Sequence, residues 1–430
     1  MTTTLKNCQL TNGDIIDIVI ENEIIKSVGA VKKNNNEIDI DGKLVIPGII
    51  DAHVHFREPG GEPKEDWSTG SRAAVSGGVT TVIDMPNNNP PAIDKQSLNI
   101  KRERASKSLC HYGFYLGATK DNLEQIKTAE NIAGVKIYVG SSTGNLLVDK
   151  DKDIEKLFTI PNILWLIHAE DENIITKNSK KFIETSNPAI HSQIRNKQAA
   201  IRAVERIINL AKKTGARVHI CHVSTKEEIE LIKKAKEERL TITCEVSPHH
   251  LFLNENAYQK KQNFAKVNPP LRTQEDNTAL MEGLTSGVID LVATDHAPHL
   301  IREKQGEYSK APAGLPEIET SLPLLLNKIN NNLTLQRLVE ITSQKPAEIF
   351  HIKNKGAIKK GYDADLTVID LKKTQIITKE MLKTKCGWSP YEGWELTGWP
   401  VMTFVNGHLV YDNGKINGQF KGKEIQYGKI

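Results

Sequence analysis

Two histidines at the end of an apolar run are the first sign of chemistry in the sequence. The run "LVIPGIID" leads directly into "AHVHF", so that His53 and His55 stand two residues apart. Side chains at positions i and i+2 of a strand point to the same side, and both imidazoles can therefore reach one cation. Zn²⁺ takes imidazole nitrogen and carboxylate oxygen as ligands. Taken alone, the pair also fits two histidines that happen to fall in a strand.

Four further residues of ligand type stand at the ends of other apolar runs. They are Lys136 in "GVKIYVG", His168 in "NILWLIHAE", His222 in "ARVHICHVS" and Asp295 in "VIDLVATDH". If these runs are the strands of a parallel barrel, their ends meet at one rim, where active sites are built. His219 stands three residues before His222, and we expect it to point away in a structural role. His249 and His250 follow another run without a clear ligand spacing.

Lys136 and Asp295 indicate the kind of reaction. A buried ammonium among cation ligands is unfavourable, and the conflict disappears if CO₂ carbamylates the lysine to a carboxylate that bridges two cations. The alternative is a lysine whose head group reaches water. A carboxylate beside a metal-activated water can take a proton from it and pass the proton to a leaving nitrogen. This set predicts hydrolysis of an amide-like bond, or its reversal, with Asp295 as the proton shuttle.

A second group of residues predicts contacts with an anionic substrate. Arg57 follows the two histidines directly, and a guanidinium at the mouth of a metal site suits bidentate capture of a carboxylate. Asn87 ends the second run, Asn268 follows the seventh, and His299 stands shortly after Asp295. Each asparagine is also compatible with an ordinary turn.

The elements that position these residues alternate along the chain. Residues 50–360 contain eight short apolar runs separated by amphipathic stretches such as "STKEEIELIKKAKEER". This rhythm predicts an α/β fold, a (β/α)8 TIM-type barrel, with a doubly wound open sheet as the rival. The first turn carries no GxGxxG, so a dinucleotide site is not supported. Residues 1–49 and 361–430 carry short strand patterns with Asn-Gly turns, and we expect both termini to form one small β-sandwich-like domain.

Composition and charge limit the partners and the compartment that we expect for the protein. The 430 residues carry a net charge of +4, and no basic stripe is interleaved with aromatics, so we expect no nucleic-acid partner. No apolar run approaches the ~20 residues that cross a membrane. Five scattered cysteines without a CxxC pair argue against a disulfide framework and favour a reducing cytoplasm.

The chain resembles dihydroorotases of the amidohydrolase superfamily, of the long bacterial and archaeal type. The resemblance rests on "PGIIDAHVHFREPG", "GVKIYVGSSTGN", "IHAE", "HICHVST", "CEVSPHHLFL", "NPPLR" and "TDHAPH". "HVHFREPG" together with "TDHAPH" is the most specific part. The chain departs from the usual pattern at Asn88, where Thr is common, near Gly61, where one residue is added, and at Glu317, where Gly is usual. None of these departures removes a ligand.

The resemblance implies two Zn²⁺ ions bridged by a carboxylated Lys136 and a hydroxide. It places His53, His55 and Asp295 on one zinc, and His168 and His222 on the other. The implied substrate contacts are Arg57, Asn87, Asn268, His299, Pro312 and Gly314. The implied reaction is the reversible cyclisation of N-carbamoyl-L-aspartate to L-dihydroorotate, with loss of water, in pyrimidine (UMP) biosynthesis. A small-molecule enzyme of this kind is expected to form a homo-oligomer, and a complex with aspartate transcarbamoylase is left open.

Two alternatives remain at this point. A dihydropyrimidinase or allantoinase would share the metal ligands and the fold, but a site for uncharged rings has no need of Arg57. A non-catalytic scaffold homologue would be a protein of another class. Such relatives typically lose ligands, whereas all six ligand positions are filled here.

Overall fold

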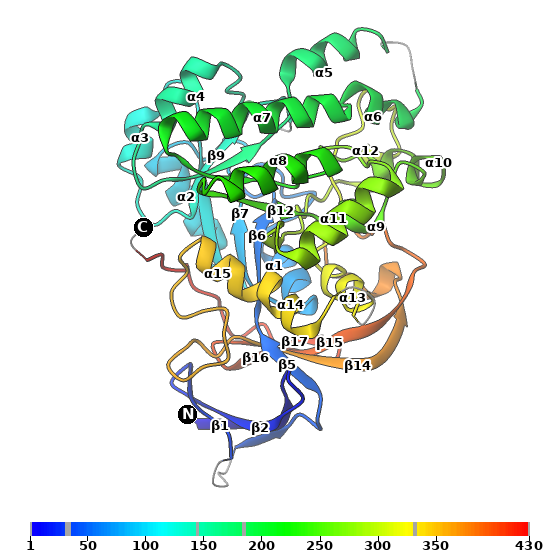
Figure 1. Ribbon diagram of the computed structural model, residues 1–430. Helices are drawn as coiled ribbons and strands as arrows, with labels where there is room; N and C mark the ends of the chain where they lie inside the picture. Colours follow the sequence, from blue (N-terminus) through cyan, green and yellow to red (C-terminus); the bar gives the residue numbers. More distant parts are fainter. Residues whose placement is uncertain (1, 31–35, 143–145, 183–185, 330–332, 429–430) are drawn as a thin grey trace.

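The computed structural model describes residues 2–30, 36–142, 146–182, 186–329 and 333–428. The end of the motif "GVKIYVGSSTGN", at positions 143–145, lies outside these ranges. The strands form one sheet of eight and one sheet of nine. In Figure 1 the larger body with its helices lies above, and the nine-stranded sheet lies below it, near the N-terminus.

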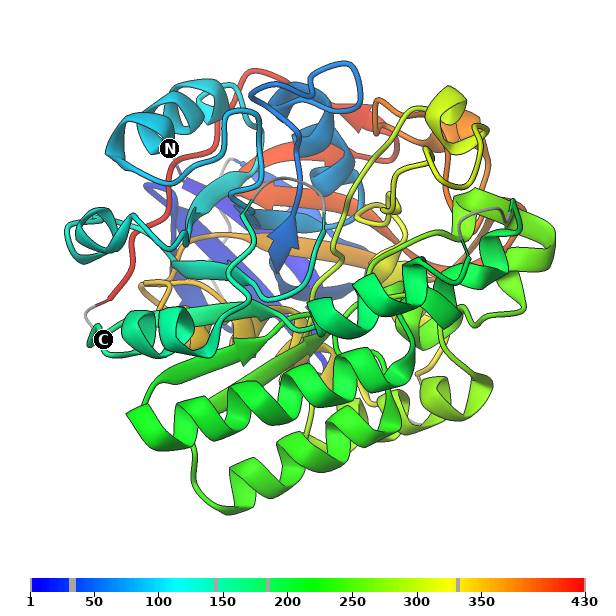
Figure 2. The same cartoon turned by 90° about the horizontal axis from the view of Figure 1, so that it is seen from above.

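The eight-stranded sheet is a parallel barrel whose strands follow in chain order. Its strands are β6 (Ile49–Val54), β7 (Val79–Asp84), β8 (His111–Gly117), β9 (Gly134–Tyr138), β10 (Leu164–His168), β11 (Arg217–Ile220), β12 (Ile242–Val246) and β13 (Leu291–Val292). Val54 pairs in parallel with His296, just past β13, and this bridge brings the two edges of the sheet together. Figure 2 shows the strands from above, surrounded by helices. The predicted barrel is therefore confirmed.

The helices lie outside the strands, and the sequence supplies caps for several of them. They are α1 (Trp67–Ser76), α2 (Lys95–Ala105), α3 (Leu123–Lys127), α4 (Asp151–Phe158), α5 (Glu172–Ser179), α6 (His191–Ile194), α7 (Lys197–Thr214), α8 (Lys226–Glu237), α9 (Pro248–Phe252), α10 (Ala257–Lys261), α11 (Gln274–Ser286), α12 (Ile301–Lys304), α13 (Ser321–Leu326), α14 (Leu335–Val339) and α15 (Lys345–Ile349). Asp66 and Thr225 close capping boxes at the starts of α1 and α8. Gly215 ends α7 in the left-handed conformation that glycine adopts without strain.

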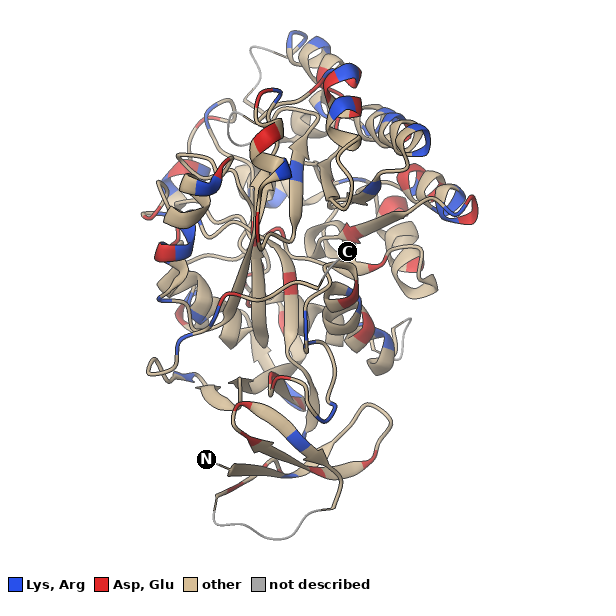
Figure 3. Ribbon diagram, turned by 90° about the vertical axis from the view of Figure 1, so that its left-hand side faces the viewer, with Lys and Arg blue, Asp and Glu red and all other residues tan. Residues whose placement is uncertain are grey.

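Burial follows the same division between strands and helices. Every residue of β6, β7, β8, β9 and β10 is buried, as expected for parallel strands covered on both faces. Figure 3 shows acidic and basic positions interspersed along the outer helices, whereas the barrel strands are mostly uncharged. None of the described helices combines the length and the apolar character needed to cross a bilayer.

The nine-stranded sheet joins the two ends of the chain. It contains β1 (Thr2–Gln9), β2 (Ile15–Glu21), β3 (Ile24–Val28), β4 (Glu37–Asp39), β5 (Leu44–Pro47), β14 (Leu366–Ile376), β15 (Glu395–Val405), β16 (His408–Asp412) and β17 (Lys415–Ile416). β5 lies between β1 and β14, so the N-terminal and C-terminal strands share one sheet. This confirms the joint β region of both termini, while its boundaries at 1–49 and 361–430 stay a prediction. Beyond β17 the chain returns to the barrel, where Glu424 pairs with Tyr112.

Candidate active site

The six predicted ligand residues meet at the carboxyl ends of the barrel strands. Three of them lie on strands and three follow a strand: His53, Lys136 and His168, then His55, His222 and Asp295. All six line one cavity of about 30 Å³, together with Arg57, Asn87, Asn268 and Gly314. The barrel therefore converts six positions spread over more than two hundred residues into one cluster, which we call the ligand cluster.

The donor atoms of the ligand cluster face one another at short range. The ring centroids of His53 and His222 lie 5.4 Å apart, and those of His168 and His222 lie 4.9 Å apart. Oδ1 of Asp295 lies 3.0 Å from Nε2 of His55 and 3.3 Å from Nε2 of His53. One ligand atom each of His53, His222 and Asp295 falls within 4.8 Å of the other two. Nitrogen and oxygen donors gathered in this way form a candidate metal site.

Lys136 is fully buried beside this group. Its Nζ lies 2.9 Å from Sγ of Cys221 and 5.2 Å from the ring centroid of Tyr138. Cys221 occurs in an apolar run of the sequence, where a small buried hydrophobe is expected. Neither neighbour carries a fixed negative charge that would compensate a buried ammonium.

Three ligand histidines are held from behind by side-chain acceptors. Nδ1 of His53 contacts the carboxylate of Glu245, and Nε2 of His168 lies 3.0 Å from Oε2 of Glu170. Nδ1 of His55 lies 2.8 Å from Oδ1 of Asn87. Contacts of this type orient a metal-binding imidazole and select its tautomer. The predicted substrate residue Asn87 thus also supports a ligand.

The two glutamates behind the histidines are anchored in turn. Arg195 donates through Nε to Glu170 at 2.9 Å. His219 lies 3.1 Å from Glu245 through Nε2. We expected His219 to point away from the site, and the structure places it inside the barrel, one contact behind His53. The spacing of His219 and His222 does not predict this, because β11 ends before His222 and the alternation of strand faces does not extend to it.

Three of the predicted site residues have a left-handed backbone conformation, which changes the direction of their side chains. Arg57, His222 and Asp295 have φ values of 63°, 36° and 48°. Positive φ is uncommon for residues other than glycine and is concentrated at functional sites, because the surrounding structure must hold it in place. The strand-end pattern alone could not show these turns.

The charges of the ligand cluster are centred on Asp295. Burial would raise the pKa of this carboxyl, but the positive charge of His53 and the hydrogen bond from His55 outweigh it and hold the pKa well below its usual range. Burial also works to lower the pKa of His53, yet Glu245 and Asp295 outweigh it and raise the pKa to about 10. Burial lowers the pKa of His55 to about 4. A carboxylate that stays charged among ring nitrogens can bind a cation and accept a proton.

A larger cavity of about 390 Å³ opens next to the ligand cluster, and its lining includes His55, Arg57, Lys64 and Asn87. Its rim carries positive charge. Nη2 of Arg57 lies 3.0 Å from Nε2 of His299, and Nζ of Lys64 donates to Nδ1 of His299 at 3.1 Å. Burial and the neighbouring Arg57 hold the pKa of His299 well below its ordinary value. The neutral imidazole accepts from Lys64 through Nδ1 and donates through Nε2 to the carbonyl oxygen of Ala313 at 3.0 Å, so it lies between two cations. We call Arg57, Lys64 and His299 the cavity rim.

Lys64 is the member of the cavity rim that the sequence did not reveal. It stands in "GGEPKEDW", in a loop without a strand-end signal, and the available clue was its closeness in sequence to Arg57. Glu303 is its ion-pair partner at 3.0 Å. Glu303 thus pairs with Lys64 and not with Arg57. Among the described residues, no carboxylate lies at ion-pair distance from Arg57.

Of the other predicted substrate residues, two line a cavity of the site and one does not. Asn268 and Gly314 line the smaller cavity. A side chain at Gly314 would begin 2.6 Å from the carbonyl oxygen of Ala297, so only glycine fits there. Pro312 lies outside both cavity linings, and its carbonyl oxygen accepts a hydrogen bond from Lys304 at 3.0 Å. His249 and His250 are also absent from both linings.

Comparison with known proteins finds relatives along nearly the whole chain. The profile of the Amidohydrolase family matches residues 44–410. A dihydroorotase from Methanosphaera stadtmanae is 39% identical over 427 residues, which cover 96% of this chain and 97% of the relative. A dihydroorotase from Lactobacillus acidophilus is 37% identical and covers 96% and 100%. Among solved structures, L-hydantoinase (dihydropyrimidinase) from Arthrobacter aurescens has a TM-score of 0.94 at 29% identity, with 99% of each chain covered.

Proposed function

The chain belongs to the amidohydrolase family and is a hydrolase acting on cyclic amides, and from this premise we propose that it is a dihydroorotase. It would interconvert L-dihydroorotate and N-carbamoyl-L-aspartate in pyrimidine biosynthesis. The observation that carries the proposal is the cavity rim beside the ligand cluster. L-Dihydroorotate carries a carboxylate on its ring, and a guanidinium without a carboxylate partner at the mouth of the site suits that group.

The donor set supports a metal-dependent reaction. His53, His55 and Asp295 would hold one Zn²⁺, His168 and His222 a second, and a carboxylated Lys136 would bridge them. The fit rests on close nitrogen and oxygen atoms and on Nδ1 of His222, which is buried without a hydrogen-bond partner among the described residues. When bound, the zinc ions lower the pKa of water and polarise the amide carbonyl.

Asp295 would move the proton in either direction. In hydrolysis its carboxylate takes a proton from the attacking water and delivers it to the ring nitrogen as the C–N bond breaks. In ring closure it takes the proton from the carbamoyl nitrogen that attacks the protonated carboxyl group, and passes that proton to the departing hydroxyl, which leaves as water. The ordinary pKa of an aspartate already leaves the carboxylate charged at neutral pH, so that it can accept a proton.

The cavity rim would bind and orient the substrate. Arg57 would pair with the ring carboxylate through two parallel hydrogen bonds, and Lys64 would add a second positive charge. Nε of Arg57 donates to the carbonyl oxygen of Pro298 at 3.1 Å, which leaves its other nitrogens directed toward His299 and the cavity. Asn268 and Gly314 would close the pocket on the opposite side. Fixing the ring in this way brings its amide to the ligand cluster.

A dihydropyrimidinase or hydantoinase is the second candidate, because a solved structure of that name superposes closely on this chain. Its substrates lack the carboxylate that the cavity rim is suited to bind. The test is turnover of L-dihydroorotate, dihydrouracil, hydantoin and allantoin by the purified, zinc-loaded protein. We expect turnover of L-dihydroorotate above that of the others. Hydrolysis of dihydrouracil or hydantoin without turnover of L-dihydroorotate would overturn the proposal, and no turnover together with failure to bind zinc would favour a scaffold.

Arg57→Ala sharpens this test. Loss of the guanidinium should raise KM for L-dihydroorotate by about 10-fold or more, the effect of losing a charge-assisted pair, while kcat changes less. Arg57→Lys keeps the charge without the planar fork and should recover only part of the affinity. Equal KM values in the three proteins would contradict the assigned contact.

The proposed setting is the cytoplasm, with the chain as a homo-oligomer and aspartate transcarbamoylase as a candidate partner. The five cysteines are all buried and unpaired, which suits a reducing compartment. Sedimentation of the purified protein alone, and mixed with the transcarbamoylase of the same organism, tests the assembly. A single monomeric species in both experiments would contradict it.

A further inference from the structure

Residues 383–391 form part of the connection between β14 and β15, yet they pack against the active-site loops of the barrel. We propose that this segment, which we call the 383–391 segment, positions the cavity rim, an inference that rests on the proposed function. It would do so through three anchors at its start, middle and end. Each anchor contacts a residue that adjoins, in sequence or in space, a predicted substrate or metal residue.

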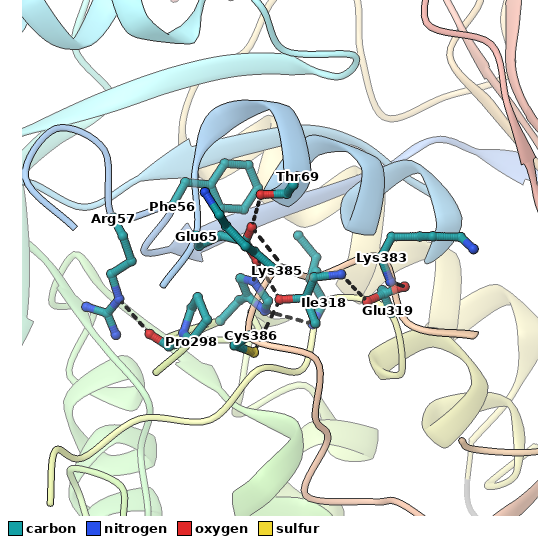
Figure 4. Close-up of polar contacts among 12 residues, drawn as sticks. Phe56, Arg57, Glu65, Thr69, Pro298, Ile318, Glu319, Lys383, Lys385 and Cys386 are labelled. Atoms are coloured by element: carbon teal, nitrogen blue, oxygen red, sulfur yellow. Dashed lines mark hydrogen bonds and ion pairs between the residues drawn. The ribbon is translucent and has the colours of Figure 1, made fainter. Parts of the chain in front are cut away.

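The first anchor is a pair of buried carboxylates that hold the start of the segment. Glu319 accepts hydrogen bonds from the backbone N–H groups of Lys383 at 2.7 Å and Thr384 at 3.0 Å. Glu65 accepts from the backbone of Lys385 at 3.2 Å, and Figure 4 shows both acids directed at the segment. Glu65 immediately follows the cavity-rim residue Lys64 in the chain. Two carboxylates removed from water need these donors, so the segment and the loops are fixed together.

The second anchor joins the middle of the segment to His299. Nε1 of Trp388 donates to the carbonyl oxygen of His299 at 2.8 Å. The indole is buried, and it packs edge-on against Phe264 with ring centroids 5.0 Å apart. Nζ of Lys304 lies 5.7 Å from the centroid of the same indole and donates to the carbonyl oxygen of Gly314 at 3.0 Å. Trp388 thus fixes the main chain of His299 next to the loop that carries Gly314.

The third anchor reaches the neighbours of the catalytic carboxylate. The hydroxyl of Tyr391 donates to Glu317, whose other oxygen accepts from Nδ1 of His249 at 2.8 Å. The backbone N–H of Glu317 donates to Nδ1 of His296 at 3.1 Å, and His296 follows Asp295 in the chain. Glu317 therefore links the segment to two elements of the site, the ring of His249 and the loop that carries His296.

The arrangement of the anchors separates effects on metal binding from effects on substrate binding. None of the three anchors contacts a member of the ligand cluster directly, so loosening one leaves the metal donors in place. It displaces instead the residues proposed to bind the substrate, and a small misplacement of such groups costs binding or orientation. A segment that only stabilised the fold would lower the melting temperature without changing KM.

Trp388→Phe is the main test, because the chain offers a matched control. Trp399 is also buried in the same apolar cluster, and its Nε1 donates to a carbonyl oxygen at 2.8 Å, that of Leu396 within β15. Trp388→Phe should raise KM for L-dihydroorotate by about three- to tenfold, the effect of one lost buried hydrogen bond, with kcat and zinc content nearly unchanged. Trp399→Phe should leave KM as in the wild type, although both variants lower the melting temperature. Equal KM values in the two variants would overturn the inference.

Tyr391→Phe and Glu317→Gln test the third anchor separately. Tyr391→Phe removes only the hydroxyl, and we expect a fall in kcat/KM of about three- to tenfold. Because both residues act through one contact, Glu317→Gln combined with Tyr391→Phe should cost less than the sum of the two single effects. Fully additive effects would show that the two residues do not work together. The proposed function fails if the wild-type protein does not turn over L-dihydroorotate. The inference alone fails if the wild type does so and the variants match it.

Discussion

The ligand cluster and the cavity rim adjoin one another, but they are held in different ways. Members of the ligand cluster lie on strands or follow them closely, and buried side chains such as Glu245 and Glu170 fix their rings. Members of the cavity rim lie on loops. Arg57 and His299 donate to the backbone carbonyls of Pro298 and Ala313, and Lys64 pairs with Glu303. The ligand cluster is therefore organised by the barrel itself, whereas the cavity rim depends on the segments that pack around it.

Asp295→Asn should have the largest effect. The change keeps the shape of the side chain but removes the charge that accepts a proton, so kcat should fall by at least ~10²-fold. Steady-state kinetics with L-dihydroorotate measures it, with zinc content determined in parallel. A kcat near the wild-type value would contradict the role of Asp295. It would also contradict the view that the ligand cluster carries out the reaction while the cavity rim binds the substrate.

Glu245→Gln should weaken zinc binding without changing the cavity rim. The carboxylate orients the ring of His53, and loss of such a contact typically costs about 10–100-fold in metal affinity. Competition with a chelator, followed by metal analysis, measures the affinity without reference to activity. The matched control is Glu303→Gln, which removes a carboxylate from the rim beside Lys64. Equal zinc loss in both variants would show that the ligand cluster and the cavity rim are not held independently.

Lys64→Met should act on the rim alone. Removal of one partly exposed charge should raise KM for L-dihydroorotate by about two- to fivefold, with unchanged zinc affinity. The difference from the wild type should shrink at high salt, because salt screens exposed charges. Lys127→Met, which removes a lysine paired with Glu124 on α3, is the control for the loss of a surface charge. A KM change of the same size in that control would assign the effect to net charge.

Glu319→Gln should give the smallest effect on turnover, because it keeps a side chain that can still accept from the 383–391 segment, and it should also change how stability depends on pH. Burial, with the nearby charge of Glu65, raises the pKa of Glu319 to about 7 from its ordinary value of 4.5. The folded protein therefore holds this proton more tightly than the unfolded chain does. The contribution is complete below about pH 4.5 and is lost as the pH rises through about 7.

Chemical denaturation at several pH values tests this linkage. Between pH 5 and pH 8 the free energy of unfolding of the wild type should fall by about 1–3 kcal/mol more than that of Glu319→Gln. Parallel profiles would show that Glu319 does not titrate in this range. Zinc affinity should be the same in both proteins, because Glu319 holds the 383–391 segment and contacts no ligand.

The barrel and the ligand cluster were predictable because each depends on a local pattern. Eight apolar runs separated by amphipathic stretches indicate a barrel, and parallel strands carry their last residues to one rim. His53, Lys136 and Asp295 could therefore be grouped from sequence positions far apart, and the structure brings them together. Their roles as zinc ligands stay predictions.

The support around the site was not predictable in the same way. Glu245 lies inside an apolar run, where one acid gives no sign of the histidine that it contacts across the barrel. Lys64 and Trp388 lie on loops, whose course depends on long-range packing and not on periodicity. The left-handed backbone of His222 and Asp295 also leaves no local signal, because the surrounding structure holds it.

The position of β5 between β1 and β14 has a consequence for the order in which the protein is made. Pro47 ends β5 and Leu366 begins β14. The edge of β5 therefore has no β14 partner while roughly 300 further residues are synthesised. At a rate of about 5–20 residues per second, that interval lasts roughly 15–60 s. During this time the nascent chain exposes an unpaired strand edge, which is a template for wrong pairing. The N-terminal sheet is therefore a part of the newborn chain for which we expect protection by the ribosome or a chaperone to matter.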